Sequence, residues 1–493
     1  MFGRKLMFVG LAASLVLSTP PAHGEDSSAL LDLLVRKHII TEKDAAEVRV
    51  DLAKTNPPPT TSSASKLKLS TPLTELELYG DARVRYEVRN GETGNNDLIN
   101  GPHDTQQRNR ERYRLRLGLR GTLADDWFFN IRLETSQSPR STNVTFGDDT
   151  SSSSPGGGGP FAKGSDGINV GQVYLGYKGF KDITLIAGKL QNPFVTTSMV
   201  WDADINPEGL SEQWKHTFAL GGSGPSQSVE SKDGKEVIAA APSGMTIDVF
   251  VNFGQFVYDD ANPENPIGPS PQGVPNTDAF LLGWQVGAKF NFTKDMYFQF
   301  APTVYNYTGA GDTFNTTFVG DPAFRRGTTT VVPNQTGVNN LLVFEMPAEF
   351  GWKIGKIPMR IFGDFAVNLD GDERAAAAGH PDEGDQRYAY QIGFGIGKIK
   401  AKNDWALSAF WQHTEQYALD PNLVDSDLFD SRVNIEGVAV TLGYAVSDAV
   451  TANLTYGYGH RADRNLGTGG VGDIGINALD KYQLFQADLN FKF

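Results

Sequence analysis

Apolar and polar side chains alternate with a period of two from residue 77 to the end of the 493-residue chain. In ELYGDARVRYEVR (77–89), one set of alternate positions is mostly apolar and the other is mostly charged. Successive side chains of a strand point to opposite faces, whereas a helix repeats every 3.6 residues. The sequence therefore predicts an all-β domain with one apolar and one polar face. Further segments with this pattern are RYRLRLGLRG (112–121), FLLGWQVGAKFNF (280–292), YAYQIGFGIG (388–397) and VAVTLGYAV (438–446).

The connections between these segments alternate between short and long. Short turns fall at 124–126, 179–182, 293–295, 355–358, 401–404 and 447–449, and long polar loops fall at 138–167, 260–278, 370–385 and 461–480. Transmembrane β-barrels of the bacterial outer membrane have short periplasmic turns and long external loops. We therefore expect an antiparallel barrel of about sixteen strands. The link at 221–244 is long where a short turn is expected, which leaves the strand register around 214–245 open.

A barrel that crosses a membrane has to close on itself, because lipid offers no hydrogen-bond partners to a sheet edge. The chain ends on QADLNFKF (486–493), whose apolar face carries Phe491 and Phe493. We expect this strand to pair with the first one. Phe493 resembles the C-terminal aromatic signal that the barrel-assembly machinery reads. A secreted soluble β-domain would also alternate, but rings near strand ends, such as Tyr456 and Tyr458, favour an interfacial aromatic girdle.

The N-terminal region predicts export and a small separate segment. Residues 1–24 combine Arg4 and Lys5, a short apolar run and a small-residue pattern at Ala22 and Gly24, as in a signal peptide. Apolar residues then follow helical spacing, so a short α-helical periplasmic segment is expected before the barrel. The expected boundaries are 1–24 for the signal peptide, 25–54 for the helical segment, 55–66 for a Pro/Ser/Thr linker and 67–493 for the outer-membrane barrel.

Composition excludes several kinds of protein. The chain has no cysteine, which rules out disulfides, thiol chemistry and cysteine metal sites. The formal net charge of −14 argues against a nucleic-acid partner. No cofactor and no metal is expected.

Several short motifs are similar to those of a known family. Asn192-Pro193-Phe194, followed by Trp201-Asp202, resembles the outer-membrane family labelled putative porin, with a more distant likeness to phosphate- and polyphosphate-selective porins. RYRLRLGLRG at 112–121 and DSDLF at 425–429 fit the same pattern. The resemblance implies passive diffusion of small polar solutes or ions, a homotrimer, and contact with outer-membrane lipid and lipopolysaccharide.

The polar face of the first three strands is rich in arginine. A guanidinium that faced lipid at mid-membrane would cost about 2–4 kcal/mol, so we expect these side chains to line the pore. They are Arg83, Arg85, Arg112, Arg114, Arg116, Arg120 and Arg132. The third long loop, 191–213, offers acidic residues that could narrow the pore opposite them. These are Asp202, Asp204, Glu208 and Glu212.

Two questions about these charges stay open from the sequence. The arginines could instead pair with Asp81, Glu87 and Glu134 as scaffolding within the wall. Because they outnumber the loop acids, a mild anion preference is expected, although the acidic external loops oppose it.

Two other functions are compatible with an outer-membrane barrel. A hydrolase would need a general base near a nucleophile, and only His413, near Glu415, is placed suggestively. An adhesin could use the long loops. Ionic conductance in a planar bilayer separates a pore from both, whereas ester or peptide turnover without conductance indicates the hydrolase.

The leader generates the first testable prediction. We expect cleavage after Gly24, so that the mature chain begins at Glu25. Intact mass spectrometry of the protein from outer membranes measures this. A mature N-terminus before Leu17 would contradict it.

Overall fold

The computed structural model describes residues 72–93, 105–136, 138–147, 167–220, 244–259, 279–309, 340–378, 380–470, 472–476 and 479–493. The chain divides into two units, residues 1–70 and 71–493. The expected signal peptide, helical segment and linker all lie outside the described residues.

Nineteen strands form one sheet in the described part of the chain. They are β1 Leu73–Glu92, β2 Thr105–Leu123, β3 Trp127–Thr135, β4 Val144–Thr145, β5 Ile168–Tyr177, β6 Ile183–Lys189, β7 Glu208–Leu220, β8 Met245–Asp259, β9 Ala279–Thr293, β10 Met296–Phe300, β11 Thr303–Gly309, β12 Leu342–Glu345, β13 Ala348–Ile354, β14 Ile357–Asn368, β15 Tyr388–Gly397, β16 Trp405–Thr414, β17 Ile435–Ala445, β18 Val450–Arg461 and β19 Lys481–Lys492.

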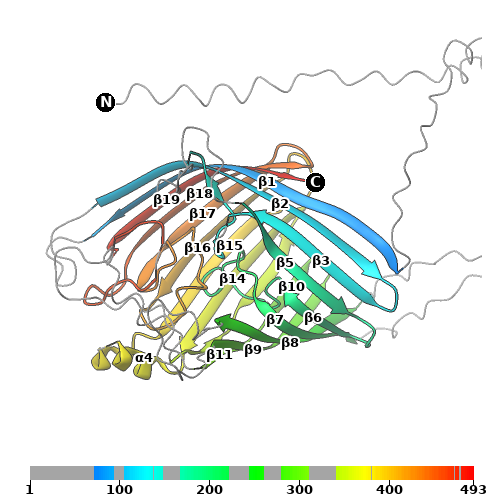
Figure 1. Ribbon diagram of the computed structural model, residues 1–493, viewed down its shortest axis with the longest axis horizontal. Coiled ribbons are helices and arrows are strands. Elements are labelled where there is room, and N and C mark those ends of the chain that lie inside the picture. The colour runs from blue at the N-terminus through cyan, green and yellow to red at the C-terminus, as the bar shows by residue number, and fades with distance from the viewer. Residues whose placement is uncertain are drawn as a thin grey trace, which may run out of the picture. The chain divides into compact units, whose positions relative to one another are not determined.

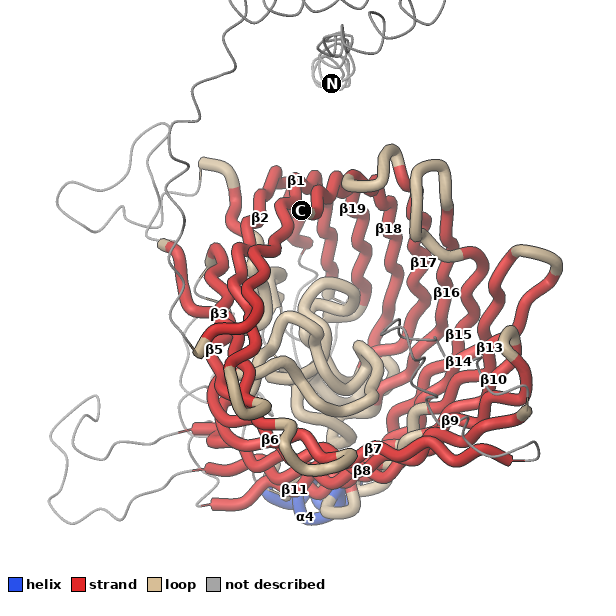
Figure 2. Tube along the Cα trace, turned by 90° about the vertical axis from the view of Figure 1, so that its right-hand side faces the viewer, coloured by secondary structure: helices blue, strands red, loops and turns tan. Residues whose placement is uncertain are grey.

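Three of these strands continue a preceding one after a short interruption. Both β3 and β4 pair with β2, both β10 and β11 pair with β9, and both β12 and β13 pair with β14. The described residues therefore form sixteen barrel strands, all antiparallel. Strand β1 pairs with both β2 and β19, so the sheet closes (Figures 1 and 2). The predicted barrel of about sixteen strands is confirmed.

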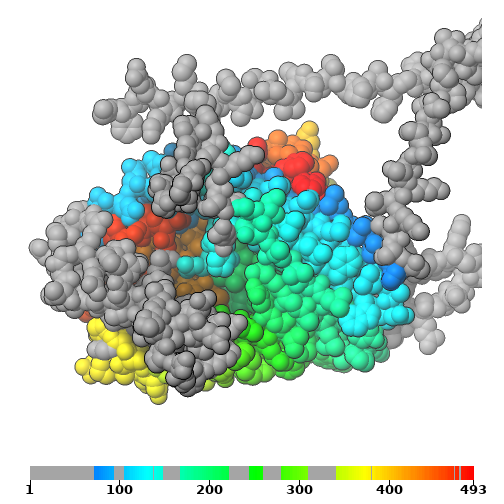
Figure 3. All heavy atoms as spheres, viewed as in Figure 1, coloured from blue at the N-terminus to red at the C-terminus, as the bar shows by residue number. Residues whose placement is uncertain are grey.

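The two faces of the sheet carry the expected side chains. Val84 is 54% exposed on the outer face, whereas its neighbour Arg85 is 4% exposed on the inner face. In the view of Figure 3, the cyan and green strands present a continuous outer surface. Outward apolar groups and inward polar groups suit a barrel that is surrounded by lipid.

Turns and loops separate to opposite ends of the barrel. The six short connections expected from the sequence all join neighbouring strands. We call this end the turn rim and the opposite end the loop rim. Strands β7 and β8 pair without a register shift from Gly209 and Phe256 to Leu220 and Met245. The link between these two strands, residues 221–243, lies outside the described residues.

Three connections from the loop rim pack inside the barrel, where loops are visible in Figure 2. We call residues 190–207 inner loop A, residues 415–434 inner loop B, and residues 462–470, 472–476 and 479–480 inner loop C. Their apolar side chains build a core within the barrel: Met199 of loop A and Val433 of loop B are fully buried. The interior is therefore partly filled.

Helical structure is confined to one connection in the described residues. Helix α4 Gly371–Ala377 and the 3₁₀ helix η2 Pro381–Glu383 lie between β14 and β15. Within the described ranges, no helix is long and apolar enough to cross a membrane.

The chain end takes part in barrel closure. The backbone N–H of Phe493 donates to Gly80 O at 3.1 Å, and Gly80 N–H donates to Phe493 O at 3.0 Å. A Cβ built on Gly80 would lie 2.5 Å from the Phe493 ring, so the glycine makes room for the terminal side chain. Phe493 therefore packs on the strand that it helps to close.

This contact generates the second prediction. Deleting Phe493, or replacing it with aspartate, should lower the amount of folded barrel, because both the ring and the terminal backbone pairing stabilise the β1–β19 seam. The heat-modifiable band in membrane fractions measures this amount. Lys492→Ala, a change at the neighbouring position that keeps Phe493, is the control. Equal amounts in the Phe493 variants and the control would contradict the prediction.

Candidate functional site

Arginines from β1 and β2 form a compact group on the inner face. The antiparallel register places Arg83 opposite Arg114 and Arg85 opposite Arg112. The side chains of Arg85, Arg112 and Arg114 are at most 7% exposed. Guanidinium groups this close repel one another unless carboxylates balance them.

Carboxylates on the strands supply part of this balance. Asp81 accepts hydrogen bonds from Arg114 and Arg116, both at 2.7 Å. Glu87 is fully buried and accepts a hydrogen bond from Arg110 at 2.6 Å. Further ion pairs within the wall are Arg89 with Glu87 at 3.0 Å, Arg85 with Asp488 at 2.6 Å, Arg132 with Glu134 at 2.9 Å and Arg120 with Glu77 at 2.7 Å.

Carboxylates on inner loop B supply a second set of negative charges that balance the arginines. Asp427 accepts hydrogen bonds from Arg85 at 2.6 Å and from Arg89 at 2.8 Å. Asp430 accepts one from Arg89 at 3.0 Å. Burial raises the pKa of Asp427, but the charges of Arg85 and Arg89 outweigh burial and hold the pKa well below its usual range. These contacts fasten loop B onto the arginine face.

Inner loop C contributes one more acid. Asp473 pairs with Arg108 at 2.8 Å and also bonds Arg110. Burial raises the pKa of Asp473, but the Arg89 and Arg110 charges hold it well below its usual range. Loops B and C thus contact Arg85, Arg89, Arg108 and Arg110 of the arginine group. Arg83 and Arg116 keep more exposure, 17% and 21%.

The four acids expected to narrow the pore do not act together in the structure. Loop A ends at Pro207, so Glu208 and Glu212 lie on β7 and not in the loop. They bond Lys189 at 2.8 Å and Gln255 at 3.2 Å, respectively. Asp204 is the one of the four that meets an arginine, Arg116, at 3.4 Å.

Asp202 instead joins loops A and B. Its carboxylate accepts a hydrogen bond from Ser426 N–H at 3.0 Å, and its own N–H donates to Leu423 O at 2.6 Å. Asp425 N–H donates to Ser198 O at 3.1 Å. Burial, and then the nearby Asp425, raise the pKa of Asp202 to about 8. The two loops thus meet at the Asp202 carboxyl group. Its raised pKa keeps this group protonated and uncharged below about pH 8.

The residues that carry the family resemblance anchor loop A to the far wall. The Phe194 ring packs edge-on against Tyr305 at a centroid distance of 5.5 Å. Asn192 accepts a hydrogen bond from Phe194 N–H at 3.0 Å, and Pro193 O accepts one from Asn252 at 3.1 Å. Trp201 is 3% exposed within the core between the loop and the wall. These residues therefore set the position of the loop.

Two hydroxyls of loop A reach carboxyl groups in the same wall. Thr196 donates to Glu345 at 2.6 Å, and Thr197 donates to Asp364 at 2.5 Å. Glu345 also accepts a hydrogen bond from Tyr305 at 2.8 Å. Loop A therefore spans the barrel from this wall to loop B.

The histidine considered for catalysis contacts two carboxylates and a tyrosine ring. His413 Nδ1 lies 2.8 Å from Glu436, and its Nε2 lies 3.7 Å from Glu415. The Tyr390 ring stacks on the imidazole at 4.8 Å. Across the described ranges, no group of three histidine or acidic side chains is placed to hold a metal ion.

Open space remains on both sides of loop A. A cavity of about 310 Å³ lies between loop A and the wall formed by β10, β13, β14, β15 and β16. A second cavity, of about 380 Å³, is lined by residues that include Glu134, Asn169 and Asp204. The first cavity has a mixed polar and apolar lining, and the second has a mainly polar one.

Comparisons with known proteins find one family model and several solved structures. The family model described as Putative porin matches residues 64–343. No match is found among curated proteins. Similar solved structures include OprB of Pseudomonas putida, with 11% identity, a TM-score of 0.42 and coverage of 85% of this chain and 94% of that one. OmpT of Vibrio cholerae has 12% identity, a TM-score of 0.40 and coverage of 86% and 100%. An anion-selective porin from Comamonas acidovorans has 11% identity, a TM-score of 0.39 and coverage of 85% and 99%.

The contact between loops A and B generates the third prediction. The folded pKa of Asp202, about 8, lies above the ordinary value of 3.8. Its contribution to stability is therefore fully present below the ordinary pKa and is lost as pH rises through the folded pKa. We expect the urea midpoint of the barrel in detergent to fall between about pH 4 and pH 8, and to fall less in Asp202→Asn.

Tryptophan fluorescence measures that midpoint, since the buried Trp201 lies next to Asp202. Asp295→Asn, which removes an exposed acid in the turn between β9 and β10 that is paired with Lys353, is the matched control. An equal loss of stability in Asp202→Asn and the control would assign the pH dependence to other groups.

Proposed function

Because the chain belongs to the putative porin family, we propose that its barrel is a water-filled channel for the passive diffusion of small hydrophilic solutes or ions across the bacterial outer membrane. The observation that supports this most is the closed sixteen-strand barrel with an apolar outer face and a polar interior that still holds cavities. We propose that the protein has no enzymatic activity.

The orientation and assembly follow from the same proposal. The turn rim faces the periplasm and the loop rim faces outside, as in other outer-membrane barrels. The N-terminal segment then lies in the periplasm. The proposed partners are outer-membrane lipid and lipopolysaccharide, the barrel-assembly machinery, and two further copies of the chain in a homotrimer.

We place the constriction of the pore where loop A faces the arginine wall. Arg116 and Asp204 meet there at 3.4 Å, and both side chains are about one-fifth exposed. Fixed charges of opposite sign in a narrow opening create a transverse field that orients polar solutes and biases ion passage. Arg83 and Arg132 extend the basic side of this opening.

The buried arginines have a different role in this proposal. Arg85 joins the wall to loop B, whereas Arg112 and Arg114 hold neighbouring parts of the wall together, which corresponds to the scaffolding interpretation of the sequence. Arg112 donates to Asn143 O at 2.9 Å, and Arg114 pairs with Asp81. Because most arginines are paired and covered, the net bias of the channel towards anions is expected to be small.

Ionic conductance tests the channel itself. Purified mature protein in a planar bilayer should open discrete ion-conducting steps without added substrate. Turnover of esters or peptides by protein that does not conduct would favour the hydrolase instead. The same recordings also test the adhesin alternative, since an adhesin needs no conductance.

Selectivity generates the fourth prediction. Asp204→Asn should shift the zero-current potential in a salt gradient towards anions, and Arg116→Gln should shift it towards cations, because each change removes one fixed charge from the opening. Asp295→Asn, which neutralises an exposed acid in the turn between β9 and β10, is the matched control and should give no shift. If the two single variants behave like the control, the constriction lies elsewhere.

A further inference from the structure

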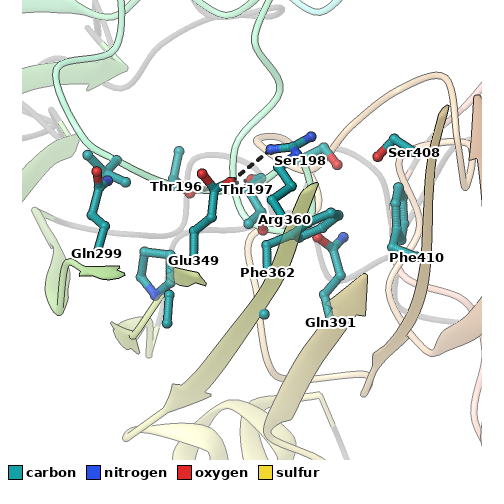
Figure 4. Close-up of a pocket in the computed structure, with 14 residues that line it drawn as sticks. Thr196, Thr197, Ser198, Gln299, Glu349, Arg360, Phe362, Gln391, Ser408 and Phe410 are labelled. Carbon is teal, nitrogen blue, oxygen red and sulfur yellow. Dashed lines mark hydrogen bonds and ion pairs between the residues drawn. The ribbon is translucent and has the colours of Figure 1, made fainter. Parts of the chain in front are cut away.

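The cavity between loop A and the far wall has a lining unlike that of the arginine side. Gln299, Glu349, Phe362, Gly393 and Phe410 lie on one hydrogen-bonded row across β10, β13, β14, β15 and β16. The side chains of the four residues other than the glycine line the same cavity, as Figure 4 shows. This row is a continuous platform on the wall of the proposed channel.

The platform carries two aromatic rings with a glycine between them. A Cβ built on Gly393 would lie 2.4 Å from the Phe362 ring, so the glycine is what allows this ring to lie against the sheet. The Arg360 guanidinium lies over the Phe362 ring, 4.9 Å from its centroid. Phe410 stands beside this pair at the cavity (Figure 4).

Charge at the platform is balanced. Arg360 donates to Glu349 at 2.9 Å, the pair drawn with a dashed line in Figure 4. These are the two charged residues among those that line the cavity. An ion of either sign that entered would lose water and gain no net opposite charge. The lining therefore favours a solute without net charge.

Several polar groups at the cavity keep free hydrogen-bonding capacity. Among the described residues, the Gln299 amide and the Ser408 hydroxyl have no side-chain hydrogen-bond partner. Gln391 donates to Gln412 at 3.0 Å and keeps a carbonyl oxygen. Amides and hydroxyls can both donate and accept, as a solute hydroxyl does. Ser198 of loop A faces them across the cavity (Figure 4).

We propose that this cavity is a binding station for an uncharged polyhydroxylated solute of about monosaccharide size. The solute places its C–H face on the Phe410 ring and its hydroxyls on the side-chain amides and hydroxyls of the lining. The volume of about 310 Å³ is at the lower end of ordinary small-molecule sites. The inference rests on the proposed channel function and names a substrate class for it. The charged constriction and this station lie on opposite sides of loop A.

The test compares three solutes with one carbon skeleton. Proteoliposomes with the full mature chain take up radiolabelled glucose, glucosamine or gluconate, which differ in charge, and ionic conductance is measured on the same preparation. Glucose uptake should saturate with concentration and should exceed the uptake of both charged sugars. Equal rates for all three solutes in a conducting preparation would overturn the station and leave the channel intact.

Variants localise the effect. Phe410→Ala and Gln299→Ala should each lower the ratio of glucose uptake at low concentration to ionic conductance, by about threefold to tenfold. Phe128→Ala is the matched control, because this ring lies on β3 next to Lys178 and outside the cavity. If Phe410→Ala fails to fold, Gln299→Ala carries the test alone.

The outcomes separate the two proposals. Absence of ionic conductance in the unaltered protein would contradict the channel. Conductance with glucose uptake that does not saturate, or with unchanged ratios in both cavity variants, would contradict only the station. Faster entry of a zwitterion such as glycine, with loss of that entry in Gln299→Ala, would assign the cavity to another solute class and would also overturn the inference.

Discussion

Burial of guanidinium groups inside the barrel is the constraint on which the interior depends. Arg89 is 1% exposed and is surrounded by Glu87, Asp427 and Asp430. A buried charge without a partner costs several kcal/mol, so the acids of loop B have to reach the wall wherever these arginines are present. The charge balance thus determines where the loop lies, and the loop in turn determines which part of the interior stays open.

Loop A connects loop B to the opposite wall of the barrel. It meets loop B at Asp202 and the far wall at Thr196 and Thr197. The barrel interior is therefore divided into a charged side near Arg116 and an aromatic, amide-rich side near Phe410. A solute that crosses the proposed channel would meet two different chemical surfaces, one suited to orienting dipoles and one suited to uncharged polar molecules.

Sequence reasoning predicted the wall better than the interior. The alternation around Val84 and Arg85 sets which side chains face out, and the resemblance carried by Asn192, Pro193 and Phe194 agrees with the family to which the chain belongs. The partners of the arginines were harder to predict. DSDLF at 425–429 was noted as a motif, yet its second aspartate, Asp427, was not considered as a partner for Arg85, because 342 residues separate the two in the chain.

The sequence by itself determined the strands, their approximate number, the apolar outer face and the closing strand, because a period of two acts locally and lipid allows no open sheet edge. Only the tertiary structure decided which acids balance the arginines, that Glu208 and Glu212 belong to a strand, and that Phe362 and Phe410 share one row. The physical reason is that a loop of about twenty residues has no repeating pattern to fix its path. That path follows from charge and packing contacts between residues far apart in the chain.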